Sequence, residues 1–300
     1  MYLGLSIENS VINAALLNDG GDFVWQDSHS LDHDIMSNLL EICGALVVNA
    51  TKAHPDLSES IAVSAQGGFV GQPSPPDGLK CLAGADLRAN LQASLGRSVA
   101  LASPGQALSL YESRFGAAKD SAVACALYLD NHVFGGVTFG QKLWRGANGI
   151  VGAWGHTPLA WPVPHELDER DCWCGRSGCL DCFLSLGGLE TEYQNITQTR
   201  LDIKAIAVAA DANDLVASSV LQVLDDRIGR TTAMIINMFD PDVIILGGRL
   251  AGLDRLYQNV PRKWPGYLLV ERNETKLQKA NQDTFTLAKG IACLAIDPAI

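Results

Sequence analysis

Positive charge is scarce in this sequence and is nowhere clustered. Its 300 residues carry 22 lysines and arginines against 33 aspartates and glutamates, which gives a net charge of −11 at pH 7. Nucleic acids and anionic membrane surfaces both attract lysine and arginine, so this balance disfavours either as a partner. We therefore expect neither a nucleic-acid partner nor a membrane partner.

Long apolar runs and low-complexity segments are also missing. No stretch approaches the roughly 18 apolar residues of a membrane helix, and the first residues lack the basic start of a secretion signal. We expect a soluble, cytoplasmic protein. In that reducing compartment, the eight cysteines favour metal binding or free thiols over disulfides.

Three of the eight cysteines lie in one short segment. Cys172-Trp173-Cys174-Gly175-Arg176-Ser177-Gly178-Cys179 follows Gly155-His156 after fifteen residues. Three cysteines and one histidine supply the four ligands that a structural, tetrahedral zinc site needs, and the two glycines permit tight reversals. The spacing predicts zinc on His156, Cys172, Cys174 and Cys179, with Cys182 or His165 as the alternative to one of them.

The predicted elements occur in one order that is repeated along the chain. A strand, a hairpin partner and helices come first, and a second strand, hairpin partner and helices follow. We expect two α/β lobes, residues 1–116 and 117–300, with an irregular insertion over about 140–190 and a last helix that packs back on the first lobe. The strands are expected at 2–7, 11–17, 60–65, 99–101, 122–129, 133–139 and 243–246, and the helices at 32–54, 87–95, 106–115, 215–238 and 284–296.

Three stretches resemble the ROK family of sugar kinases and repressors. They are Gly152–Leu159, Cys172–Leu180 and Asp240–Gly248, and they occur in the order typical of the family. The long gap between the histidine and the cysteines, with Pro-Leu-Ala-Trp after the histidine, most resembles the bacterial fructokinases of that family. The resemblance implies a two-lobed actin-like ATPase fold of the ribonuclease H type, a zinc-binding insertion and a homodimer.

The same resemblance implies a site between the lobes. In such kinases Mg-ATP lies there, and the γ-phosphoryl group passes to a sugar hydroxyl. By position, Asp181 and His156 would contact the sugar, and Gly247 and Gly248 would approach the nucleotide. The alternative for the two glycines is a turn after a strand, without a ligand.

The chain departs from the family where phosphates would bind. The first phosphate loop should read Asp-x-Gly-Gly-Thr-Lys, and here Ser6-Ile7-Glu8-Asn9-Ser10-Val11 stands in its place. The second should read Gly-Thr-Gly, and here Asp130-Asn131-His132 follows the strand. Glu8 and Asp130 therefore place carboxylates where phosphate oxygens are expected.

Two further positions that the family uses for catalysis and for sugar binding are changed. The catalytic aspartate is replaced by Pro104, which has no side chain able to accept a proton, so we assign no catalytic residue. A sugar-contacting glutamate three residues before the histidine is replaced by Ala153. Asp130 with His132 is interpreted as a solvated hairpin turn rather than as new acid–base chemistry, and Asp225-Asp226-Arg227 as solvated surface charges.

These losses predict a fructokinase-like ROK protein that is catalytically impaired or inactive, with a sugar-binding or regulatory role and a structural zinc ion. The first alternative is an active ATP-dependent hexose kinase (fructokinase) that uses displaced residues, and only this alternative requires Mg-ATP. The second alternative is a repressor-type relative without its DNA-binding domain. A small-molecule sugar is the expected ligand in the first two cases.

Overall fold

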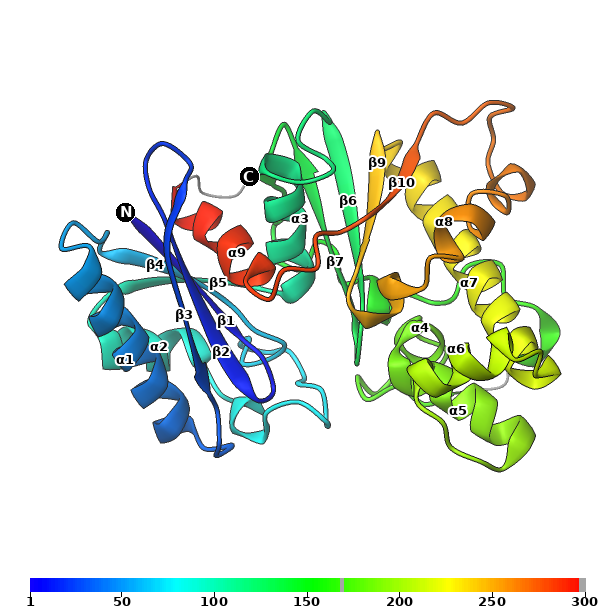
Figure 1. Ribbon diagram of the computed structural model, residues 1–300, viewed down its shortest axis with the longest axis horizontal. Coiled ribbons are helices and arrows are strands. Elements are labelled where there is room, and N and C mark those ends of the chain that lie inside the picture. Colours follow the sequence, from blue (N-terminus) through cyan, green and yellow to red (C-terminus); the bar gives the residue numbers. More distant parts are fainter. Residues whose placement is uncertain (168–169, 297–300) are drawn as a thin grey trace.

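The computed structural model describes residues 1–167 and 170–296, which form two five-stranded sheets with helices around them (Figure 1). The strands are β1 (Tyr2–Ile7), β2 (Val11–Leu17), β3 (Phe23–Ser30), β4 (Ser60–Ser64), β5 (Ser98–Ala102), β6 (Val123–Leu129), β7 (Val133–Phe139), β8 (Lys142–Leu143), β9 (Val243–Gly247) and β10 (Lys276–Lys279). The helices are α1 (Met36–Ala53), α2 (Leu87–Leu95), α3 (Pro104–Arg114), α4 (Asp181–Leu184), α5 (Leu186–Thr197), α6 (Ile203–Asp211), α7 (Leu215–Phe239), α8 (Leu256–Asn259) and α9 (Thr286–Ile296).

The two sheets repeat one topology. Their strand orders are β3-β2-β1-β4-β5 and β10-β9-β6-β7-β8. In each sheet a central strand pairs antiparallel with the next strand of the chain and parallel with a strand that follows a helix. The duplicated order of elements inferred from the sequence therefore has a structural counterpart in both halves.

Burial along the strands explains which of them the sequence revealed. From its second residue, β1 is buried throughout, as a continuous apolar run predicts. β3 instead alternates between half-buried and exposed side chains at the edge of its sheet, and its sequence FVWQDSHS is largely polar. Strand β3 was not predicted from the sequence, because its pairing with β2, and not its own composition, makes it a strand.

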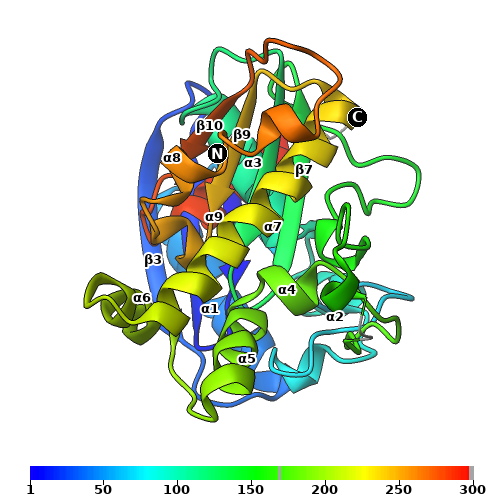
Figure 2. The same cartoon turned by 90° about the vertical axis from the view of Figure 1, so that its right-hand side faces the viewer.

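Helices cover the second sheet more heavily than the first. The long helix α7 runs across it, and the shorter helices α4, α5 and α6 lie near one end (Figure 2). The expected irregular insertion is shorter than predicted, because α4 and the start of α5 fall within residues 140–190. No single described helix is long and apolar enough to cross a membrane. Helices α6 and α7 meet that criterion only together, and a bend of 115° separates them.

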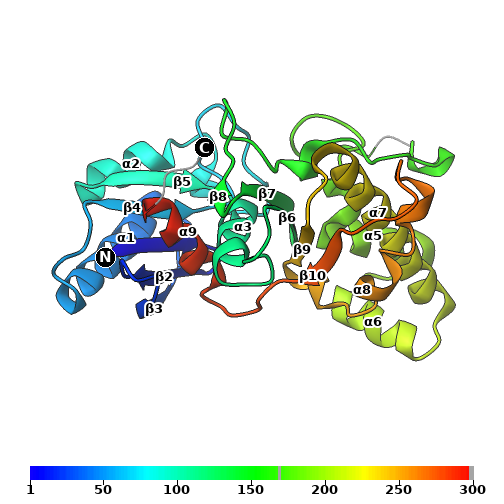
Figure 3. The ribbon, with the colours of Figure 1, turned by 90° about the horizontal axis from the view of Figure 1, so that it is seen from above.

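Helices α3 and α9 lie between the two sheets (Figure 3). Helix α9 packs so closely on β1 that a Cβ atom on Gly4 would lie 2.1 Å from the carbonyl oxygen of Ala288. Helix α3 packs on β7 in the same way, since a Cβ on Gly105 would lie 2.4 Å from Cα of Gly135. Because α3 precedes residue 117 and yet packs on the second sheet, the division at 116 stays a prediction.

Replacing Gly4 by alanine should destabilise the protein. The added methyl group would overlap the backbone of α9, and overpacking of this kind costs about 1–3 kcal/mol or more. Gly252→Ala is the matched control, because no atom lies within 4 Å of the added Cβ. Urea denaturation followed by circular dichroism should give a lower midpoint for Gly4→Ala than for Gly252→Ala; equal midpoints would show that α9 does not pack on β1 as described.

Candidate functional site

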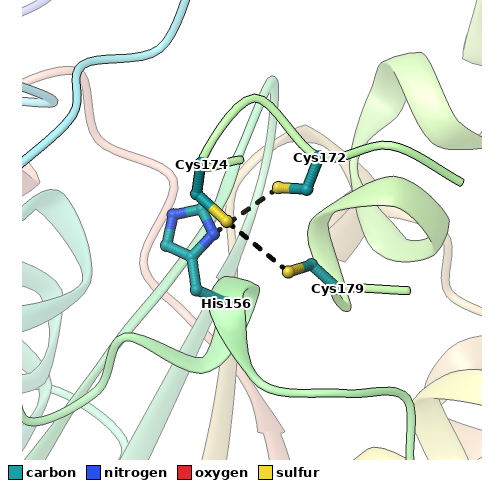
Figure 4. Close-up of side chains that lie close together, drawn as sticks. All are labelled: His156, Cys172, Cys174 and Cys179. Carbon is teal, nitrogen blue, oxygen red and sulfur yellow. Dashed lines mark hydrogen bonds between the residues drawn. The ribbon is translucent and has the colours of Figure 1, made fainter. Parts of the chain in front are cut away.

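One histidine and three cysteines of the insertion converge on a point (Figure 4). The ligand atoms of His156, Cys172, Cys174 and Cys179 all lie within 4.8 Å of one another. Cys172 Sγ is 3.7 Å from His156 Nδ1, and Cys174 Sγ is 3.7 Å from Cys179 Sγ. In a tetrahedral site with Zn–S bonds of about 2.3 Å, ligand atoms are separated by about 3.7 Å. The four side chains therefore fit a zinc ion.

Local backbone geometry produces this arrangement. Gly175 and Gly178 adopt positive φ angles of 85° and 71°, which side chains other than glycine rarely tolerate. The reversal is closed by a hydrogen bond from Cys172 N to Arg176 O, at 2.8 Å. Burial also lowers the pKa of the fourth side chain, His156, which favours the neutral imidazole that binds metal ions.

Neither alternative ligand belongs to this group. Cys182 Sγ faces the carbonyl oxygens of Arg170 and Asp171, at 3.6 and 3.7 Å. His165 lies in a separate short turn, Pro164–Glu166, outside the group of converging ligand atoms. The four ligands named from the sequence are thus the residues that the fold brings together.

A second group of polar side chains is centred on the buried carboxylate of Asp181, which is 4% exposed. Its Oδ1 accepts a hydrogen bond from Val133 N at 2.6 Å, and its Oδ2 accepts one from Trp173 Nε1 at 2.7 Å. Nδ1 of His132 lies 2.8 Å from the same Oδ2. Asp181 is therefore committed to three protein partners.

His132 continues this chain of contacts to the other half of the molecule. Its Nε2 contacts Asp77, which belongs to the loop between β4 and α2. Burial alone would lower the pKa of His132, but the hydrogen bonds and charges of Asp181 and Asp77 outweigh it, so the pKa is raised. The expectation of a solvated turn is wrong for His132, which is only 7% exposed. No sequence signal pointed to this contact, because Asp77 and Asp181 are remote in the chain.

A large cavity among the described residues lies beside this chain of contacts and has a volume of about 470 Å³. Asp77, His132, Trp173 and Asp181 line one part of it, and Arg249 lines another. Its wall also includes the start of α5, where Gly187 and Gly188 follow Leu186.

A neighbouring cavity of about 280 Å³ brings together residues that the family resemblance assigns to the phosphate loops. Glu8, Asp130, Gly247 and Gly248 all line it. Asp130 is paired with Arg249, whose Nη2 lies 2.6 Å from Oδ1 and whose backbone N donates to Oδ2 at 2.9 Å. Burial and the nearby charge of Asp130 raise the pKa of Glu8 against the hydrogen bonds from its neighbours.

Gly248 has a structural role in this cavity wall. Its φ is 81°, and an added Cβ would lie 2.2 Å from the carbonyl oxygen of Leu129. Close packing of the turn after β9 on the end of β6 therefore explains this glycine without a ligand. Nucleotide contacts by Gly247 and Gly248 stay a prediction.

A third cavity, of about 210 Å³, borders the group of converging ligands at His156 and Cys174. Its wall carries aromatic rings from both halves, Phe69, Phe134 and Trp173, and the imidazole of His156. Ala153, the position at which the resemblance implies a glutamate, also lines it. Asp181 lines the adjacent large cavity instead, and Trp173 lines both.

Pro104 occupies the first turn of α3, and its neighbours Ser103 and Gln106 line this third cavity. Ser103 caps the helix, with its Oγ accepting from Gln106 N at 3.3 Å, and its own N donates to Gln106 Oε1 at 3.1 Å. The Nε2 group of Gln106 donates to the carbonyl of Val151 at 3.0 Å. These side chains are engaged in holding the helix start and the insertion together.

Buried ion pairs anchor the insertion to α7. Glu166 Oε1 accepts from Arg227 Nε and Arg230 Nη2, both at 2.8 Å, and these side chains are 1–2% exposed. Arg230 Nη1 also donates to the carbonyls of Ala160 and Trp161 at 3.1 and 2.6 Å. Burial would raise the pKa of Glu166, but the hydrogen bonds from Arg230 and Arg227 lower it to about 2. The expectation of solvated charges is therefore wrong for Arg227 and also for Asp225, which are 1% and 2% exposed.

Comparison with known proteins gives consistent results. A model of the ROK family matches residues 2–297. The N-acetyl-D-glucosamine kinase of Vibrio cholerae is 29% identical over 217 residues, which cover 71% of this chain and 72% of that protein. A ROK hexokinase from Thermus thermophilus matches with a TM-score of 0.86 at 22% identity, over 98% of this chain and 97% of the other. A ROK family glucokinase from Streptomyces griseus, in complex with glucose and AMPPNP, matches with a TM-score of 0.77 at 22% identity, over 98% and 99%.

These likenesses confirm the predicted fold, the two-lobed actin-like ATPase fold. The relatives named above are kinases of N-acetyl-D-glucosamine, hexose and glucose. They support a sugar kinase ancestry in general and not a fructokinase in particular.

Removing the charge of Glu166 should destabilise the insertion. Glu166→Gln removes the buried carboxylate that both guanidinium groups share and leaves Arg227 only Glu192 and Arg230 only Asp226. Breaking a buried pair costs about 3–5 kcal/mol. Glu274→Gln is the control, because its ion pair with Arg272 is exposed and worth about 1 kcal/mol or less. Chemical denaturation of both variants should separate them; similar stabilities would contradict the anchoring role.

Proposed function

The chain belongs to the ROK family, and from this premise we propose that it is a sugar-binding member whose phosphoryl transfer is impaired and whose insertion holds a structural zinc ion. One observation carries the proposal. The cavity beside Gly247 and Gly248 is lined by the carboxylates of Glu8 and Asp130, at the positions that correspond to the family's phosphate loops.

Charge is the first obstacle to phosphate binding. Phosphoryl transfer depends on positioning the phosphates and stabilising their negative charge. A like-charge pair at about 4 Å costs about 1 kcal/mol in water and severalfold more when partly buried. Arg249 could offset this repulsion, but its guanidinium group is already bound by Asp130.

The lost base is the second obstacle. Pro104 offers no proton acceptor, and the neighbouring Ser103 and Gln106 are engaged in capping α3. Loss of a positioned general base lowers rates by roughly 10²- to 10⁴-fold. Both obstacles arise at separate places in the cleft, so a single compensating residue does not remove them.

The zinc ion would be held by His156, Cys172, Cys174 and Cys179. Four protein ligands leave no open position for water, so the ion would stabilise the insertion and take no part in chemistry. Trp173 stands between two of these ligands and donates to Asp181. Zinc would therefore also hold the wall shared by two of the cavities.

The cavity beside His156 is the proposed sugar site. Phe69, Phe134 and Trp173 offer apolar faces, and Gln66 carries a buried Oε1 atom without a hydrogen-bond partner among the described residues. A sugar matches this mixture, because its C–H face packs on aromatic rings and its hydroxyls donate hydrogen bonds. Direct contact with Asp181, the family homodimer and a cytoplasmic location stay predictions.

A second candidate is an active hexose kinase with a displaced base, and His132 is the observation in its favour. Its Nδ1 is held by the buried carboxylate of Asp181, which is how an acid–base histidine is oriented in many enzymes. Its Nε2 would accept a hydroxyl proton only after leaving Asp77.

Binding of Mg-ATP tests the charge argument. Isothermal titration calorimetry should detect no binding to the wild-type protein at millimolar nucleotide. Glu8→Gln combined with Asp130→Asn removes two negative charges, so affinity should rise by about tenfold or more at about 1 kcal/mol for each charge. Asp211→Asn, an exposed change distant in the chain from the cavity residues, is the control. Micromolar binding by the wild type would contradict the proposal.

Metal analysis tests the zinc site. Inductively coupled plasma mass spectrometry of the purified chain should find about one zinc per molecule, as expected for a four-ligand site. Cys174→Ser should lose most of the zinc, because a hydroxyl is a poor replacement for a thiolate. Cys182→Ser should retain it, since Cys182 lies outside the converging ligands. Equal zinc contents in the two variants would exclude the assigned ligands.

A further inference from the structure

We propose that His132 is a pH-sensitive latch that joins the two halves of the molecule across the cleft. Asp77 lies in the loop between β4 and α2 of the first sheet, and His132 lies in the turn between β6 and β7 of the second. Their contact is the one hydrogen bond that joins residues 66–79 to the second half within the described part of the chain. This inference does not depend on whether the cleft transfers phosphoryl groups.

The number of protons on the ring decides whether the latch is complete. Nδ1 of His132 faces the Asp181 carboxylate at 2.8 Å, and Nε2 faces the Asp77 carboxylate. A neutral imidazole has a single N–H group, so it can donate to only one of them. The other carboxylate would then face a ring lone pair. Only the imidazolium form donates to both carboxylates at once.

The carboxylates of Asp181 and Asp77 differ in their burial and in the number of their hydrogen bonds. Asp181 is buried and also accepts from Val133 N and Trp173 Nε1. The Asp77 side chain is 54% exposed, and its carboxylate has no other described partner. Deprotonation of His132 should therefore leave the contact with Asp181 intact and release Asp77.

Other charged groups near His132 have partners of their own. Trp173 packs edge-on against the ring, with centroids 5.4 Å apart, and separates it from His156. Arg249 is paired with Asp130, Arg170 with Glu192, and Arg200 with Glu190. Asp171 accepts from Ser177. Asp181 and Asp77 are therefore the charges that raise the pKa of His132 against the effect of burial.

Release of Asp77 would alter access to the cleft. The same loop contributes Pro76 and Asp77 to the wall of the cavity of about 470 Å³. It contributes Phe69, Gln72 and Pro73 to the wall of the third cavity, of about 210 Å³. The contribution of the latch is fully present below the ordinary pKa of histidine and is lost as the pH rises through the raised pKa of His132. The cleft is thus held closed at lower pH and freed at higher pH.

Hydrogen exchange of the loop tests the latch. The full-length, zinc-containing protein is compared at about pH 6 and about pH 8.5, with rates corrected for intrinsic exchange. In the wild type, exchange over residues 66–79 should accelerate by about tenfold or more at the higher pH, because one charge-assisted hydrogen bond is lost. Asp56→Asn, an exposed change on the same half, should behave like the wild type.

Asp77→Asn makes the test specific. A carboxamide can donate N–H to the neutral ring nitrogen, so the bridge should persist at high pH and exchange should become nearly independent of pH. NMR titration of His132, assigned with His132→Gln, should also show a lower pKa in Asp77→Asn than in the wild type. Loop exchange that is equal at both pH values in the wild type, or that accelerates equally in Asp77→Asn, would overturn the proposal.

Discussion

The carboxylate of Asp181 is the interaction on which the cleft of this protein depends. It joins the start of α4 to two other segments. It accepts a hydrogen bond from Trp173 in the segment Cys172–Cys179, and it accepts one from Val133 N and contacts His132 in the β6–β7 turn, which is remote in the sequence. A buried carboxylate without such partners would be strongly unfavourable, so the three contacts hold one another in place. Where the family is expected to present a carboxylate to the sugar, this chain uses one to organise its own structure.

The proposed function separates the fold of this protein from the charges in its cleft. The chain belongs to the ROK family, and its fold is that of solved ROK proteins. In the proposal, Glu8 and Asp130 line a cavity at positions that the family resemblance assigns to phosphate loops, and Pro104 begins α3 where the resemblance implies a base. Many residues along the chain determine the fold, whereas catalysis depends on a few side chains. Catalytic activity can therefore be lost while the fold is kept.

Local patterns in the sequence were enough to predict several of the strands and helices. The strands β1 and β2, the helix α2 and the strand β7 were predicted with their observed bounds, because each has a clear apolar period or turn signal. The spacing of the cysteines and glycines, with the upstream histidine, predicted the four side chains that converge. The contacts of His132 and the burial of Arg227 were not predicted, since each depends on partners brought together only by the tertiary fold. The edge strand β3 was missed for the same reason.

We propose that this protein retains the ROK scaffold and has impaired phosphoryl transfer, and ADP release measures this most directly. The purified, zinc-containing protein would be incubated with Mg-ATP and with glucose, fructose or N-acetyl-D-glucosamine, beside the Vibrio cholerae kinase as a positive control. The account predicts ADP release no faster with any sugar than without one. Rapid sugar-dependent release that His132→Gln abolishes would contradict it and would identify an active kinase with a displaced base.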